Sequence, residues 1–129
     1  MNELIKKIKE GIIALEKENQ PLLICALFLR EDSLEKWDIV VAASWLDSRV
    51  MESYKIVVST LHRFLNESER VQVSRIVLLD QDDPVVSYLQ SLKTITNGGF
   101  EELKESELSE KFRFDIRRAY LLRSQKLDF

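Results

Sequence analysis

Cysteine, histidine, proline and glycine are all scarce in this chain. Its 129 residues include one cysteine, one histidine, two prolines and three glycines. Cys25 alone cannot form an intramolecular disulfide. Because His62 is the only histidine, and lies far from Cys25 in sequence, a zinc site would lack ligands. The low content of glycine and proline also argues against long disordered linkers. Together these absences exclude folds held by disulfides or by zinc.

Long apolar runs are missing as well. The run at residues 22–29 is far short of the roughly 20 residues that span a bilayer. Lysines and glutamates occur throughout the N-terminal segment, which is unlike a signal peptide. We therefore expect a cytoplasmic protein with no membrane partner. The length suits a single domain over residues 1–129.

The net charge of −3 argues against nucleic-acid binding by the whole surface. The charge is unevenly distributed, however. Residues 111–126 hold six basic side chains and one acidic one, whereas residues 101–110 hold five glutamates and one lysine. This contrast indicates either two solvated faces or a surface that orients a partner or steers self-association.

The first half of the chain predicts a helix, two strands and a second helix. Residues 3–17 carry apolar side chains at helical spacing, and Gly11 either weakens this helix or lets a neighbour pack closely. Residues 22–29 are continuously apolar, as in a strand covered on both faces. Residues 37–45 predict a second strand, joined to the first as an antiparallel hairpin.

The helix after the second strand has the strongest pattern in the chain. Asp47 and Ser48 are good N-cap residues for it, and it should end near residues 66–70. Its apolar positions recur at helical spacing: Val50, Met51, Tyr54, Val57, Val58, Leu61, Phe64 and Leu65. We expect these positions to form its buried stripe.

A third strand and a third helix follow. Residues 74–79 form a short apolar strand, and a strand–helix–strand order implies that it lies parallel to the second strand. Asp82 or Asp83 can cap the next helix, with Pro84 in its first turn. Residues 97–99 mark a turn. Residues 111–117 alternate as in a strand, continued by residues 119–123, although a helix also fits them.

These elements predict one α/β domain, on the border of the α+β class. The expected order is helix, strand, strand, helix, strand, helix and a C-terminal strand. Its sheet should be mixed, with an antiparallel hairpin, one parallel strand and helices packed on its faces.

Aspartates gather where the parallel strands should end. Asp47 follows the second strand, and Asp80, Asp82 and Asp83 follow the third. Because α/β proteins bind ligands beyond the carboxyl ends of strands, these oxygens are candidate ligands for Mg²⁺ or Mn²⁺. Asp80, Asp82 and Asp47 are then the candidate catalytic residues of a metal-dependent enzyme on phosphate-containing substrates. Helix capping explains the same aspartates without any metal.

Other features leave further alternatives open. The same aspartates, Asp47, Asp80, Asp82 and Asp83, together with Glu102-Leu103-Lys104 loosely resemble the acids and lysine of a metal-dependent nuclease. Trp37 and Trp45 should share one face of a regular strand, either sealing the core or anchoring an interface. The segment with Arg113, Arg117 and Arg118 interleaves arginines with aromatics, as in proteins that bind single-stranded nucleic acid. An exposed strand there could instead pair with a second copy.

The chain has no Gly-rich phosphate loop, no Gly-x-Ser-x-Gly elbow and no complete nucleophile set. The leading hypothesis is therefore a non-catalytic protein-interaction or regulatory module, acting as a homodimer and needing no cofactor. A Mg²⁺- or Mn²⁺-dependent enzyme and a nucleic-acid-binding protein are the alternatives.

Overall fold

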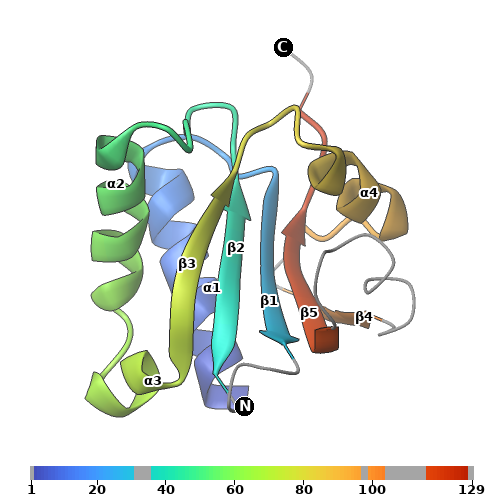
Figure 1. Cartoon of the computed structure of the whole chain (residues 1–129). Coiled ribbons are helices and arrows are strands. Elements are labelled where there is room, and N and C mark those ends of the chain that lie inside the picture. The colour runs from blue at the N-terminus through green and yellow to red at the C-terminus, as the bar shows by residue number, and fades with distance from the viewer. Residues whose placement is uncertain (1, 31–35, 97–98, 104–115, 128–129) are drawn as a thin grey trace.

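The computed structural model describes residues 2–30, 36–96, 99–103 and 116–127. Over these residues, four helices pack on one five-stranded mixed sheet in the order β3-β2-β1-β5-β4 (Figure 1). The predicted α/β class, its mixed sheet and the order of its main elements are confirmed. Two short elements, α3 (Glu67–Val71) and β4 (Glu101–Leu103), add to those that the sequence predicts.

Helix α1 (Asn2–Glu18) lies behind the sheet beside α2 (Met51–His62) (Figure 1). The two helices approach closely where α1 has Gly11. An ideal Cβ at this position would lie 2.6 Å from Leu61 Cδ2, far inside van der Waals contact. Gly11 therefore allows α1 and α2 to pack closely, which is one of the two roles that the sequence left open for this glycine.

The centre of the sheet is an antiparallel hairpin, as predicted. β1 (Ile24–Arg30) pairs with β2 (Trp37–Ala42), and Leu27 lies opposite Ile39. Nearly all of β1 is buried because both faces of the sheet are covered. Residues 22–29 are a continuous apolar run for this reason.

Two apolar cores lie on opposite faces of the sheet. One core includes Ile8 of α1, Leu61 of α2 and Ile39 of β2. The other includes Leu89 of α4 (Pro84–Leu92) and Phe28 of β1. Figure 1 shows α4 in front of the sheet and α1 behind it.

β3 (Val73–Leu79) pairs in parallel with β2, confirming the predicted crossover. It forms one edge of the sheet, and β4 forms the other. The carboxyl ends of β2 and β3 therefore meet at one end of the sheet. This juxtaposition places the residues that follow Ala42 beside those that follow Leu79.

Three predicted boundaries were wrong. β2 ends at Ala42 rather than at Trp45, and α2 ends at His62 rather than near residue 66. The N-cap of α2 is Val50, without a side-chain hydrogen bond, rather than Asp47 or Ser48. The side chains of Asp47 and Ser48 bond to Arg49 and Asp80 instead, so they do not reach the first turn of the helix.

The C-terminal segment forms β5 (Ile116–Ser124), and residues 111–115 and 97–98 lie outside the described residues. The strand alternative is therefore confirmed from residue 116 onward. The expectation of an exposed C-terminal strand that could pair with a second copy was wrong, because β5 lies between β1 and β4. Its antiparallel pairing with β1 buries most of its side chains.

None of the helices in the described part of the chain is long and apolar enough to cross a membrane.

Candidate functional site

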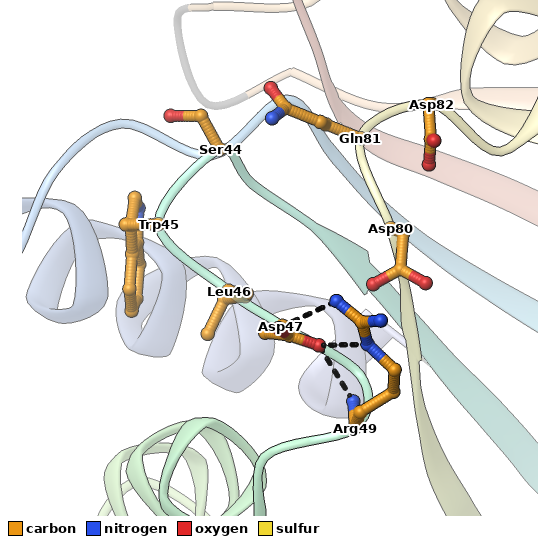
Figure 2. A pocket seen from close by; sticks show the side chains of 8 residues that line it. All are labelled: Ser44, Trp45, Leu46, Asp47, Arg49, Asp80, Gln81 and Asp82. Carbon is orange, nitrogen blue, oxygen red and sulfur yellow. Dashed lines mark hydrogen bonds and ion pairs between the residues drawn. The ribbon is translucent and has the colours of Figure 1, made fainter.

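A pocket opens beyond the carboxyl ends of β2 and β3, where the sequence predicts a site. It has a volume of about 580 Å³. Its lining comes from the loops after the two strands: Ser44, Trp45, Leu46, Asp47, Arg49, Asp80, Gln81 and Asp82 (Figure 2). The structure thus brings together Asp47, Asp80 and Asp82, which are 35 positions apart at most in sequence.

Asp47 is held by Arg49, a residue that the sequence did not single out. Asp47 Oδ1 accepts hydrogen bonds from the backbone N–H of Arg49 at 2.9 Å and from its Nε at 3.1 Å, and Oδ2 accepts from Nη2 at 3.2 Å. These side-chain and backbone hydrogen bonds lower the pKa of Asp47. The same bonds, with the negative charges of Asp47, Asp80 and Asp82, raise the pKa of Arg49.

Asp80 ties the two loops together. Its Oδ1 accepts from the backbone N–H of Ser48 at 3.0 Å, and its Oδ2 accepts from Ser48 Oγ at 2.8 Å. In Figure 2 the guanidinium of Arg49 extends from Asp47 toward Asp80. Arg49 pairs directly with Asp47 alone, while Asp80 and Asp82 act on it through their negative charge, so the pocket keeps a negative balance.

Asp83 does not belong to this pocket. It is the N-cap of α4, its Oδ1 accepts from the backbone N–H of Val85 at 2.9 Å, and Pro84 follows at the start of the helix. The capping role predicted for this turn is confirmed for Asp83. Asp82 lines the pocket instead.

Metal binding requires ligands that converge on one point. Among the described residues, no group of three or more His, Cys, Asp or Glu side chains is placed to hold a metal ion together. Asp47 already has a cationic partner, which competes with a divalent ion for the same oxygens. Glu102, which the nuclease alternative adds to the aspartates, lies on β4, three strands away from β2. Lys104 lies outside the described residues.

The two tryptophans contact the protein interior. Trp37 is 5% exposed, and its ring lies 5.6 Å from that of Tyr120. Trp45 lies beyond the end of β2, so the two residues do not share a regular strand, yet both pack against the same core. Trp45 Nε1 donates to the backbone oxygen of Gln20 at 2.9 Å. These positions suit the core role that the sequence offered as one alternative.

The structure describes two of the three arginines that the sequence singled out in the C-terminal segment. Arg113 lies outside the described residues. Arg117 and Arg118 are neighbours at an irregular point of β5, because the pairing with β1 passes from Ile116 to Arg118 and leaves Arg117 as an extra residue. Arg118 Nη2 donates to the hydroxyl of Tyr120 at 2.6 Å, and its guanidinium lies 3.9 Å from Glu102.

Cys25 and His62 lie outside the pocket. Burial raises the pKa of the Cys25 thiol to about 12, so the residue behaves as a small apolar side chain. His62 is the last residue of α2, at the boundary of the core. Partial burial is the main cause that lowers the pKa of His62, and the nearby positive charge of Arg70 is the second cause. Neither residue has the surroundings of an activated nucleophile or base.

A second surface, which the sequence analysis missed, lies on α2. Val57 and Leu61 are buried, but Met51 is 64% exposed, Val50 45% and Tyr54 40%. The prediction that all eight apolar positions form one buried stripe was wrong for these three exposed residues.

No protein-family model matches this chain, and no curated protein or solved structure matches it.

Proposed function

We propose that this protein is a non-catalytic module that works through protein contacts, and that its contact surface is formed by α2 and the adjoining edge of β3. We refer to this surface as the α2–β3 surface. The single observation that carries the proposal is the exposure of Met51 and Tyr54 on α2 and of Val50 at its N-cap. Large apolar side chains grouped on one helix face are typical of contact surfaces.

The neighbouring edge of the sheet adds backbone groups to this apolar face. β3 has β2 on one side only, and within the described chain no strand pairs with its other side. An unpaired strand edge offers N–H and C=O groups to another chain. Figure 1 shows α2 running beside β3 at this edge. Apolar side chains and backbone hydrogen-bonding groups are therefore available together.

The contacts within the pocket favour a ligand-binding role for it less strongly than the α2–β3 surface favours protein contact. Asp47 is neutralised by Arg49, and Asp80 is occupied by the two groups of Ser48. Among the described residues of the pocket, Asp82 is the aspartate whose side chain makes no hydrogen bond. A Mg²⁺- or Mn²⁺-dependent enzyme acting on phosphate-containing substrates, with Asp80 and Asp82 as ligands, is the alternative. The convergence of the aspartates at the strand ends supports it.

The proposal is tested by photo-crosslinking in intact cells that produce the protein. A photoreactive amino acid replaces Met51 in one variant and Glu10, an exposed residue of α1, in a matched control. We expect a discrete protein adduct from position 51 and none from position 10. Equal or absent adducts at both positions would reject the α2–β3 surface as a protein-contact surface.

A further inference from the structure

We propose that the partner at the α2–β3 surface is a second copy of this chain, related by a two-fold axis. In this arrangement β3 pairs antiparallel with β3 of the second copy, and α2 packs antiparallel against its own copy. The inference rests on the proposed function, because it names the partner of that same surface. Two five-stranded sheets would then join into one continuous sheet.

The shape of the edge allows such pairing. The register of β2 and β3 shifts between Trp37 and Asp38, which leaves Ser74 as an extra residue near the start of β3. From Arg75 to Leu79 the pairing with β2 is regular. Of these residues only Ile76 is buried, with an exposed fraction of 9%. A regular, partly exposed stretch of this length is enough for strand addition.

The same two-fold axis brings the exposed face of α2 into the interface. Ile76 of β3 and Val57 and Leu61 of α2 belong to one core, so α2 covers the face of the sheet next to this edge. An axis perpendicular to the sheet keeps both copies of α2 on that face. Met51, Tyr54 and the half-buried Val58 would then lose solvent contact together with the strand edge. An edge strand alone would not account for these apolar side chains.

The charges along the α2–β3 surface are self-complementary. Glu52, Asp80 and Asp82 lie at one end, near the start of α2 and the end of β3, where they outnumber Arg49, which pairs with Asp47. Arg63, Arg70 and Arg75 lie at the other end, where they outnumber the exposed Glu67 of α3. A two-fold rotation places the acidic end of each copy at the basic end of the other. A parallel arrangement would instead bring like charges together.

The basic end is held in place by partners within the chain. Arg75 Nε lies 3.1 Å from Asp38 Oδ2, and the side chain of Asp38 is only 2% exposed. Arg63 Nη2 lies 2.6 Å from Glu18 Oε2, and Arg70 Nη2 donates to the backbone oxygen of His62 at 2.6 Å. Arg75 and Arg63 remain about half exposed. Their guanidinium groups can therefore meet carboxylates of a second copy without large rearrangement.

Charge reversal at each end gives a sharp test. One variant carries Glu52→Lys and Asp82→Lys, and a second carries Arg63→Glu and Arg70→Glu. Arg75 is left unchanged because it faces the buried Asp38. A control carries Glu3→Lys and Glu10→Lys on exposed positions of α1, which is the same charge change as in the first variant. Sedimentation equilibrium measures the mass of each protein, and circular dichroism checks that each is folded.

We expect a wild-type dimer, an unchanged control and a dissociation constant raised at least about tenfold in either reversed variant, since each contact occurs twice. An equimolar mixture of the two reversed variants should recover the dimer mass, with one copy of each. That result follows only if opposite ends of two copies face each other.

Two results would overturn the inference: a wild-type protein that stays monomeric at about 100 μM, or reversed variants that dimerise as well as the wild type. A monomer that still gives an adduct from position 51 would leave the proposed function standing and reject only the second copy. If a reversed variant fails to fold, hydrogen exchange of the wild type decides. The amides of residues 75–79 should become more protected as concentration rises, and unchanged protection would reject the β3 pairing.

Discussion

Arg123 Nη2 donates to Glu16 Oε1 at 2.6 Å, which joins the last strand of the sheet to the first helix. Both side chains are largely buried, with exposed fractions of 9% and 17%. Glu16 Oε2 also accepts from the backbone N–H of Leu22 at 2.8 Å and from Gln125 Nε2 at 3.3 Å. The Glu16 carboxylate thus joins three segments of the chain: α1, the residues just before β1 and the C-terminal end of β5.

Glu16→Ala should therefore lower the free energy of unfolding by about 3 kcal/mol, because it leaves the buried charge of Arg123 without a partner. Chemical denaturation measures the loss. Glu18→Ala is the matched control, since its ion pair with Arg63 has the same 2.6 Å length but is about half exposed. That change should stay within about 0.5 kcal/mol. Equal effects of the two substitutions would contradict the assigned role of Glu16.

Gly11→Ala should destabilise the protein even though alanine favours helices by about 1 kcal/mol over glycine. The added Cβ would lie 2.6 Å from Cδ2 of Leu61, which is 1% exposed and has little room to move. Overpacking of this kind costs about 1–3 kcal/mol. In a Leu61→Ala background the same substitution should become stabilising. A Gly11→Ala effect of the same sign in both backgrounds would show that Leu61 is not the cause.

The Cys25 thiol should be inert in the native protein. With its pKa raised to about 12 by burial, about one thiol in ten thousand is ionised at pH 8. Alkylation by iodoacetamide, followed by mass spectrometry, should be negligible in buffer and rapid in denaturant. Rapid modification of the native protein would show that this part of β1 opens to solvent.

His62 should make the protein less stable as the pH falls. Its pKa in the folded protein lies below the ordinary value of 6.5 because of burial and the charge of Arg70. The unfolded chain therefore binds more protons than the folded one, and stability is lost as the pH falls from about 6.5 through the lower folded pKa. Between pH 7.5 and 5.5, urea unfolding should show a larger loss for the wild type than for His62→Gln. A parallel response of the two proteins would assign the pH dependence to other groups.

Divalent cations should leave the thermal unfolding midpoint unchanged. Arg49 holds Asp47 and Ser48 holds Asp80, so a metal ion would have to displace existing contacts. The measurement compares the wild type with Asp80→Asn in millimolar Mg²⁺ or Mn²⁺, with and without nucleotides. A ligand at about 100 times its dissociation constant adds about 2.7 kcal/mol of stability. A shift of several degrees in the wild type, lost in Asp80→Asn, would support the metal-dependent alternative instead.

Periodicity and apolar runs predicted α1, β1, β2, β3 and α4, because each of these elements buries a regular face. The predicted parallel pairing of β2 and β3 also led to the prediction that Asp47, Asp80 and Asp82 converge, as they do in the pocket. The role of Arg49 could not be read in the same way. Its position beside Asp47 depends on how the loop after β2 folds, and local sequence does not determine that geometry.

The two short elements were missed for different reasons. α3 begins with a capping box in which Asn66 Oδ1 accepts from the backbone N–H of Glu69, and Glu69 Oε1 accepts from the backbone N–H of Asn66. The Asn-x-x-Glu pattern of this motif was present in the sequence. β4 has only three residues and no burial pattern of its own. Its pairing with β5 depends on tertiary structure alone.

The position of β5 has a consequence for the way the chain acquires its structure during synthesis. β1 is the central strand, and Leu27 pairs on one side with Ile39 and on the other with Tyr120. The first partner leaves the ribosome soon after β1, whereas the second follows only when about ninety more residues have been added. Until then the nascent chain exposes the unpaired backbone edge of β1 together with its apolar side chains. We expect this partly made sheet to be the species most prone to aggregation and most dependent on chaperones.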